Sequence, residues 1–385
     1  MDERSFLQIP GPTNVPERIR IAVAQPMINH RSAEFTDLLS TVSQGIRAMM
    51  RTSGDVLFFP SSGSGGLEST IVNLHNPGDK ILNFDMGVFS ARVGKIGAKF
   101  GLDVNTVALP WGSAVKPEDV LKVLEADKDH KIRTVYLPHT ETTTGVANPI
   151  REIGEAIAES GHPALYVVDA VSSFASMPLE MDSYHIDVVV SAAQKGLMLP
   201  PGFSIVALNA KAWDRAAEAT LPKWYWDYAT VLAKMKDGQF PYTPATALLF
   251  GLRESLKMIN EEGLENVWQR HNQLASLVRG SINAMGLSLF AEPGYRSDTL
   301  TTIHLPDGVA WKDLSKSLQA DFNVVLGGGL DKLAGKIFRI GHMGYLSKMD
   351  VYAIMGAIEM ELIKLGYPVE PGTTAAFIAR ELAKS

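Results

Sequence analysis

Three features of the sequence that are suited to catalysis or ligand binding each follow a short apolar run. They are the amine of Lys195, the carboxyl group of Asp169 and the glycine-rich segment 62–66. Lys195 comes after the run 187–190, and the glycine, proline and apolar residues around it could keep it from water. Burial lowers the pKa of a lysine, and the neutral amine can then form a Schiff base with an aldehyde. The glycines of 62–66 allow close approach of a ligand, and the helix predicted after them favours an anion such as a phosphate.

Asp169 lies 26 residues before Lys195, a separation that corresponds to one step between neighbouring strands of a parallel sheet. Because parallel strands end at the same edge of the sheet, we expect the two side chains to meet there. An acid that faces a ring nitrogen, a lysine that binds an aldehyde and a loop that holds a phosphate define a site for pyridoxal 5'-phosphate. The acid would keep the pyridine ring protonated, and the lysine would also move the α-proton of the substrate.

Each of these features also has a simpler structural interpretation. A glycine-rich turn can just join a strand to a helix, and the segment 62–66 matches neither the P-loop nor the Rossmann spacing. An acid at the end of a strand often caps the following loop, and a lysine in a loop is usually a solvated surface charge. The hypothesis of a cofactor site therefore depends on all three features occurring together.

The segments around these groups alternate between predicted strands and helices. Short apolar runs predict strands at 55–59, 80–84, 134–137, 165–168 and 187–190. Apolar spacing predicts helices over 32–50, 67–74 and after Gly87. This order is typical of an α/β fold with a mostly parallel sheet covered by helices.

The C-terminal third has a different pattern. Residues 254–285 are predicted to form one long helix, and sparse strands at 300–304 and 323–325 then alternate with helices. We therefore predict an N-terminal arm over 1–20, a large cofactor-binding domain over 21–260 and a smaller C-terminal α/β domain over 261–385.

The composition excludes several classes of protein. With 46% hydrophobic and 20% charged residues in 385, the chain is globular rather than disordered. A net charge of −6 without a basic run argues against nucleic-acid and membrane partners. The absence of cysteine removes thiol nucleophiles and cysteine-bound metals, and we expect no metal. No apolar run approaches the roughly 18 residues of a membrane span, and we expect a cytoplasmic protein.

Ordered motifs along nearly the whole chain resemble those of one enzyme family. They lie at 9–16, 30–32, 62–64, 139–146, 168–173, 194–202, 242–244 and 338–344. In these motifs the chain is similar to the class V pyridoxal phosphate enzymes of fold type I, and most similar to the serine–glyoxylate and alanine–glyoxylate aminotransferases. The resemblance implies a pyridoxal phosphate-dependent transfer of an amino group from serine, alanine or aspartate to glyoxylate or a similar small 2-oxo acid.

The resemblance also implies roles for individual residues. Lys195 would bind the cofactor as a Schiff base, and Asp169 would face the pyridine nitrogen. The remaining cofactor contacts within one chain would come from Ser62, Gly63, Ser64, Phe89, Thr142 and Gln194. Of these, Phe89 would stack on the ring, although ordinary core packing is an alternative, and Thr142 would lie near the ring hydroxyl.

The resemblance further implies a homodimer with shared active sites, because Tyr242 and Thr243 would reach the phosphate of the neighbouring subunit. Arg339 would hold the substrate carboxylate through a bidentate pair. Arg31 and Arg92 lie near the matched segments, but nothing in the sequence directs either of them into the site. A class V lyase or a purine-pathway glyoxylate aminotransferase is the alternative function.

Overall fold

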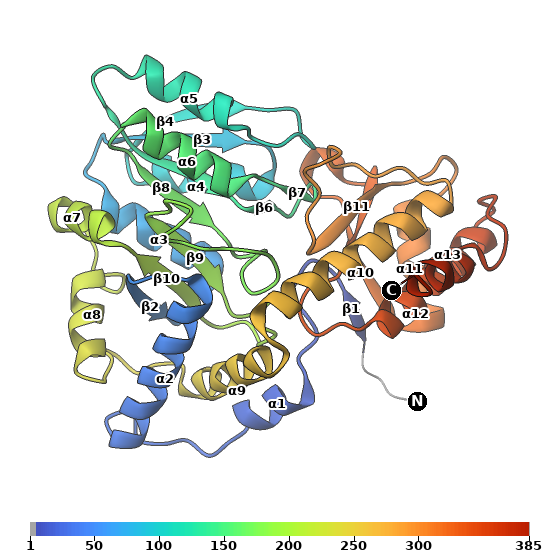
Figure 1. The fold of residues 1–385 in the computed structure, drawn as a ribbon, viewed down its shortest axis with the longest axis horizontal. Coiled ribbons are helices and arrows are strands. Elements are labelled where there is room, and N and C mark those ends of the chain that lie inside the picture. The colour runs from blue at the N-terminus through green and yellow to red at the C-terminus, as the bar shows by residue number, and fades with distance from the viewer. Residues whose placement is uncertain (1–4, 385) are drawn as a thin grey trace.

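The computed structural model describes residues 5–384, and within them the main element is a seven-stranded sheet with helices on both faces (Figure 1). Its strands are β2 (Asp55–Phe59), β3 (Lys80–Asp85), β4 (Asp103–Ala108), β5 (Ile132–Pro138), β8 (Leu165–Asp169), β9 (Val188–Ala192) and β10 (Ser204–Leu208). Their order is β2-β10-β9-β8-β5-β3-β4. β10 runs antiparallel to both neighbours, and the other pairs are parallel. The predicted α/β fold with a mostly parallel sheet is confirmed.

Both faces of this sheet are buried, which explains the continuous apolar runs in the sequence. One face is covered by α2 (Ala33–Met50), α5 (Pro117–Ala126), α6 (Ile150–Ser160) and α9 (Thr246–Glu262). The other face is covered by α3 (Gly63–Leu74), α4 (Val88–Lys99), α7 (Ala210–Glu218) and α8 (Tyr228–Lys236). In β2, Val56 and Phe58 belong to the first apolar core, and Leu57 and Phe59 belong to the second. This alternation is the two-residue period of a strand.

The single helix predicted over 254–285 is wrong, because the structure divides this segment into α9 and α10 (Leu264–Ala284). Between them, Gly263 has a φ of +88°, a conformation that favours glycine. The apolar periodicity continues across the break and therefore does not reveal it. α3 begins at Gly63, earlier than the predicted start near residue 67. The prediction missed this first turn because glycine has a low helix propensity.

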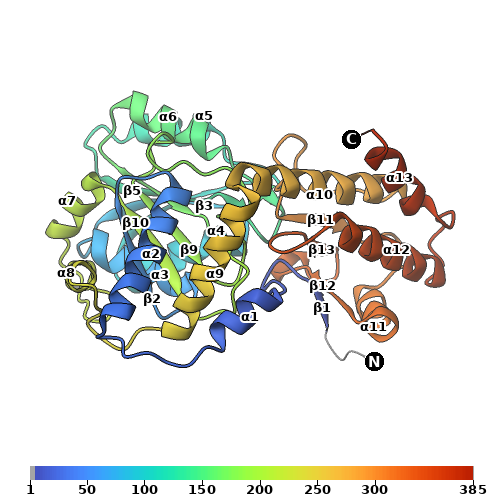
Figure 2. The ribbon, with the colours of Figure 1, turned by 60° about the horizontal axis from the view of Figure 1, so that its bottom comes forward.

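A smaller, four-stranded sheet combines the beginning of the chain with its last third. It consists of β1 (Phe6–Gln8), β12 (Val324–Gly328), β13 (Ile337–Gly341) and β11 (Leu300–His304), in that order. β1 lies parallel to β12, and the other pairs are antiparallel. Figure 2 shows α11 (Trp311–Phe322), α12 (Lys348–Lys364) and α13 (Thr373–Leu382) on the outer side of this sheet, with α10 running from the larger sheet to the smaller one.

The domain limits at residues 20 and 260 stay predictions, and residues 1–4 and 385 lie outside the described part of the chain. β1 lies within the predicted arm and pairs with the smaller sheet. α1 (Glu17–Val23) crosses the predicted limit at residue 20 and packs against α9. Among the described residues, no helix is both long enough and apolar enough to cross a membrane.

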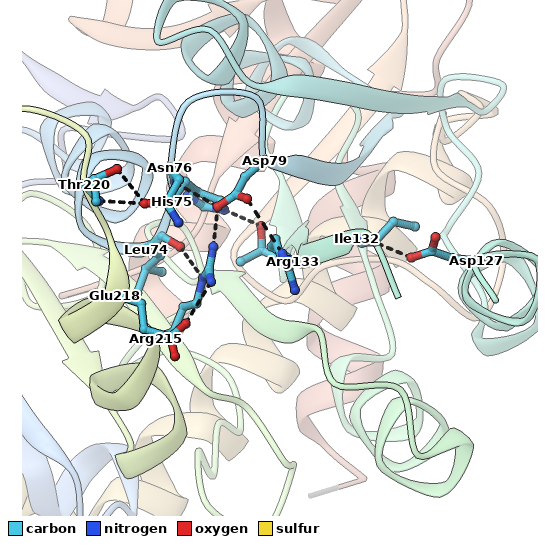
Figure 3. Close-up of polar contacts among 11 residues, drawn as sticks. Leu74, His75, Asn76, Asp79, Asp127, Ile132, Arg133, Arg215, Glu218 and Thr220 are labelled. Carbon is cyan, nitrogen blue, oxygen red and sulfur yellow. Dashed lines mark hydrogen bonds and ion pairs between the residues drawn. The ribbon is translucent and has the colours of Figure 1, made fainter. Parts of the chain in front are cut away.

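A polar network around Asp79 links the amino ends of β3 and β5 with α7 (Figure 3). Asp79, just before β3, accepts a hydrogen bond of 2.7 Å from the backbone N–H of Asn76 and pairs with Arg215. Nε of Arg215 also donates to the carbonyl of Leu74 at 2.9 Å. The network therefore fastens α7 to the end of α3 and to the residue before β3.

Candidate active site

Asp169 and Lys195 lie together at the carboxyl edge of the larger sheet. Asp169 is the last residue of β8, and Lys195 follows the end of the neighbouring strand β9 by three residues. Both side chains line a cavity of about 320 Å³. The same wall contains most of the other residues expected to contact a cofactor: Ser62, Gly63, Ser64, Phe89, Thr142 and Gln194.

The glycine-rich segment places the first turn of α3 close to the sheet. A Cβ atom on Gly63 would lie 2.6 Å from Cγ2 of Val171, and one on Gly66 would lie 2.8 Å from Cγ1 of Val190. Larger residues would therefore push α3 away from the cavity. Ser62 is the N-cap of α3, and its side chain makes no capping hydrogen bond. Since the first N–H groups of a helix have no partner within it, this end of α3 can hold an anion.

Lys195 is desolvated by the N-terminal arm. Its Nζ donates a hydrogen bond to the carbonyl of Pro10, and a Cβ atom on Gly11 would lie 2.6 Å from Nζ. Burial lowers the pKa of Lys195 to about 8, against the opposing effect of Asp169, and the charges of Arg339 and Arg92 lower it further. About a tenth of the amine is therefore unprotonated and nucleophilic at pH 7, far more than for a solvated lysine.

Asp169 is perturbed in the opposite sense. Burial raises the pKa of its carboxyl group to about 6, although Oδ1 accepts a hydrogen bond of 2.9 Å from the N–H of Val171. The negative charge of Glu141 also raises this pKa, whereas Arg92 and Lys195 lower it. Such a carboxylate gains stability from a cationic partner, and a protonated ring nitrogen provides one.

Phe89 is positioned by the buried carboxylate of Glu141, which lies in the short strand β6 (Thr140–Glu141). Glu141 is fully buried, and its Oε2 accepts a hydrogen bond of 2.7 Å from the N–H of Ser90 in the first turn of α4. Its Oε1 accepts one of 2.9 Å from the N–H of Thr143. A negative charge at this helix end is favourable, and it orients the turn that carries Phe89.

Arg339 lies beside the cavity rather than in its lining. From β13, its Nη1 donates to the carbonyl of Thr142 at 3.0 Å, and its Nε donates to the carbonyl of Gly328 at 2.9 Å. Burial lowers its pKa to about 10, so it stays cationic at neutral pH. The hydroxyl of Thr142 donates to Ser172 Oγ at 2.7 Å, and both of these residues line the cavity.

Tyr242 and Thr243 do not line the cavity of this chain. The ring of Tyr242 stacks on Tyr225, with 4.4 Å between ring centroids, and its buried hydroxyl lies near that of Tyr225 without a well-aligned hydrogen bond among the described residues. Thr243 is exposed. The nearby Trp224 is 82% exposed, so it is not part of the core.

Arg92 lines the cavity, although the sequence did not direct it there. It follows Phe89 by three residues in α4 and therefore lies on the same helix face, a spacing that could have identified it. Its Nη1 donates to Ser64 Oγ at 2.8 Å. Arg31, in contrast, donates to Gln239 in an exposed position and is absent from the cavity lining.

These residues fit pyridoxal phosphate. The cavity offers a partly unprotonated amine, an acid that favours a cationic partner and an open helix end beside Ser62. Oε1 of Gln194 is buried without a partner among the described residues, so the side chain of Gln194 can still form a hydrogen bond to a ligand in the cavity. Together, the fold and the site define a pyridoxal phosphate-dependent transferase of fold type I.

Comparison with known proteins identifies the family. The family described as "Aminotransferase class-V" matches residues 18–344. The chain is 39% identical to the L-aspartate–glyoxylate aminotransferase of Paracoccus denitrificans, over 98% of this chain and 96% of that protein. It is also 39% identical to the serine–glyoxylate aminotransferase of Methylorubrum extorquens, over 97% and 94% of the two chains. The crystal structure of ureidoglycine–glyoxylate aminotransferase from Bacillus subtilis is similar with a TM-score of 0.92 at 25% identity, covering 99% of this chain and 98% of that one.

The chain belongs to the class V aminotransferases. Its reaction is therefore the transfer of an amino group between an amino acid and a 2-oxo acid, with pyridoxal 5'-phosphate as cofactor. The family, the cofactor and the type of reaction expected from the sequence are confirmed.

The raised pKa of Asp169 predicts that the free energy of unfolding of the apoprotein falls as the pH rises. The ionised carboxylate destabilises the fold, so the stability associated with the neutral acid is lost as the pH rises from about 4 through 6. At pH 8, the apoprotein with Asp169→Asn should have a free energy of unfolding higher by about 1–2 kcal/mol than the unsubstituted apoprotein. The difference should disappear near pH 4, and urea unfolding across this range measures it.

Asp103→Asn is the matched control, because Asp103 is an exposed acid at the start of β4. This variant should show no such difference. Equal stability of the Asp169→Asn and unsubstituted apoproteins at pH 8 would contradict the assignment of a destabilising charge to Asp169.

Proposed function

We propose that this enzyme transfers the amino group of serine, alanine or aspartate to glyoxylate. The observation that carries the proposal is the arrangement of the two arginines near the cavity. Arg339 lies beside Thr142, whereas Arg92 is directed toward Ser64 at the glycine-rich loop, away from Arg339 as a partner for one substrate. Glyoxylate, serine and alanine each have one carboxylate and need one cation, whereas 2-oxoglutarate, and aspartate as a donor, would need a second cation for the distal carboxylate.

The similar proteins support this proposal. Those from Paracoccus denitrificans, Methylorubrum extorquens and Bacillus subtilis all carry glyoxylate in their names, and they differ in the amino donor. The acceptor is therefore the more constrained of the two substrates. A class V lyase or an enzyme that acts on a purine-derived donor such as ureidoglycine is the alternative.

The roles proposed for Lys195 and Asp169 follow from their perturbed pKa values. Pyridoxal phosphate supplies an aldehyde that binds amines and a protonated ring that withdraws electrons from the substrate. Nζ of Lys195 would bind the aldehyde, and as a free amine it would move the α-proton of the substrate. The carboxylate of Asp169 keeps the proton on the ring nitrogen.

The other residues hold and orient the reacting groups. Phe89 stacks on the ring, and the hydroxyl of Thr142 contacts the ring hydroxyl. Arg339 holds the substrate carboxylate with its guanidinium group, whose planar geometry suits a bidentate pair. The phosphate is held by the groups around the start of α3: Ser62, Gly63, Ser64 and Gln194.

The composite site of a homodimer is also part of the proposal, since Tyr242 and Thr243 lie outside the cavity of their own chain. Their side chains would contact the phosphate bound by the neighbouring subunit. The buried hydroxyl of Tyr242 supports this role, because it makes no well-aligned hydrogen bond among the described residues and buried polar groups normally find a partner. The cytoplasmic location stays a prediction.

Lys195 should carry the cofactor. Borohydride reduction of the holoenzyme followed by peptide mapping should place the pyridoxyl group on Nζ of Lys195, because this lysine combines burial with a lowered pKa. Lys95, exposed on α4, is an internal control that should stay unmodified. A label on any other lysine would refute the assignment.

Glyoxylate should be preferred over 2-oxoglutarate by at least about tenfold in kcat/KM, because a buried carboxylate without a cationic partner costs more than 1.4 kcal/mol. A matrix of serine, alanine, aspartate and ureidoglycine against glyoxylate, pyruvate and 2-oxoglutarate measures this preference. A higher kcat/KM for 2-oxoglutarate would overturn the proposed acceptor. Release of ammonia and an oxo acid without any acceptor would indicate a lyase instead.

Active sites shared between subunits should allow complementation. Lys195→Ala subunits and Tyr242→Phe, Thr243→Ala subunits should each have low activity, but coexpression should restore activity well above either parent. In a hybrid dimer, one site would combine an intact Lys195 with an intact Tyr242 and Thr243. Sedimentation of an active monomer, or unchanged cofactor affinity in the double variant, would count against the shared site.

A further inference from the structure

Arg92 is a half-buried cation in the cavity that none of the roles above uses. It lies one turn after Phe89 in α4, and its guanidinium carbon is 4.7 Å from the centroid of the Phe89 ring. Its Nη1 donates to Ser64 Oγ at 2.8 Å, the hydrogen bond that fixes its direction. This arrangement aims the guanidinium group across the cavity wall from α4 toward the start of α3.

The charge of Arg92 is only partly balanced by Asp169, which is near enough for Arg92 to lower its pKa. Within residues 5–384, no ion pair joins Arg92 to a carboxylate, and Asp169 is the one acidic residue in the cavity lining. Because a partly buried cation without an ion pair is costly, the position favours an anionic ligand. The cation also lowers the pKa of the neighbouring Lys195, a cost that an anion in the cavity would reduce.

The direction of Arg92 distinguishes between the two anions of the reaction. Ser64 is the second residue of α3 and therefore belongs to the turn whose free N–H groups and positive helix end favour a phosphate. The substrate carboxylate is assigned to Arg339, which contacts Thr142 and Gly328 instead. Without Arg92, the groups proposed around the phosphate are hydroxyls, including those of Tyr242 and Thr243 from the neighbouring subunit, backbone N–H groups and the amide of Gln194, none of which carries a formal charge.

We propose that Arg92 is a cofactor-binding residue that neutralises the phosphate of pyridoxal phosphate, together with Ser64 and the start of α3. This assignment rests on the proposed function, because it requires the phosphate to lie at the glycine-rich loop. Arginine suits the position better than lysine, since its planar group can stack on Phe89 while its separate N–H groups bind Ser64 and the phosphate. Phe89 and Arg92 thus form one unit of α4 that contacts the ring with one residue and the phosphate with the other.

The test compares two ligands that differ by the phosphate alone. Equilibrium dissociation constants of pyridoxal phosphate and of pyridoxal are measured on apoenzyme of the unsubstituted chain, Arg92→Gln and Arg92→Lys. Arg92→Gln should weaken pyridoxal phosphate binding by about 10- to 100-fold, the range of a charge-assisted hydrogen bond, and leave pyridoxal binding within about twofold. Arg92→Lys should have an intermediate effect. Lys95→Gln, an exposed cation on the same helix, should change neither constant.

Two results would overturn the assignment. An equal loss of affinity for both ligands would mean that Arg92 merely supports the position of Phe89. Unchanged affinity for pyridoxal phosphate with a lowered ratio of aspartate to serine kcat/KM would mean that Arg92 contacts a second substrate carboxylate. Failure of the unsubstituted chain itself to bind pyridoxal phosphate would instead overturn the proposed function, so the two failures are distinguishable.

Discussion

The burial of an acid and an amine at one edge of the larger sheet is the constraint on which the rest of the site depends. Asp169 and Lys195 follow neighbouring parallel strands, so β8 and β9 deliver them to the same place. Desolvation raises the pKa of the acid to about 6 and lowers that of the amine to about 8. In water, the lysine would be almost fully protonated at neutral pH and a poor nucleophile. The burial that destabilises the ionised carboxylate of Asp169 in the apoprotein therefore also makes the amine of Lys195 a better nucleophile.

Excluding water from Lys195 requires segments that are distant in the chain. Pro10 and Gly11 of the arm lie against the lysine, and Thr13 binds the backbone on either side of it. The N–H of Thr13 donates to the carbonyl of Gln194 at 3.2 Å, and its hydroxyl donates to the carbonyl of Lys195 at 3.1 Å. The arm begins as β1 in the smaller sheet, so the cover over the lysine is anchored there. A shift between the two sheets would therefore change the solvation of the reactive amine.

Glu141 acts both on the start of α4 and on the charged groups Asp169 and Arg339. Its carboxylate accepts hydrogen bonds at the start of α4, where Phe89 and Arg92 lie in successive turns. Its charge raises the pKa of Asp169 and also opposes the lowering of the pKa of Arg339 by burial. Gly87 is required for this contact, since a Cβ atom there would lie 2.3 Å from Cδ of Glu141. One buried acid thus influences the turn that carries Phe89 and the pKa values of Asp169 and Arg339.

The sequence by itself determined the alternation of strands and helices and the family, because these depend on residue types within short segments. The tertiary structure alone decided which distant segments meet. The pairing of β1 with β12 and the placement of Arg92 beside Ser64 depend on how whole faces pack together. The break at Gly263 was missed because apolar spacing records which side of a helix is buried, and that side is unchanged across the turn. The pKa values of the acid and the amine follow from burial, a property of the assembled fold rather than of any local pattern.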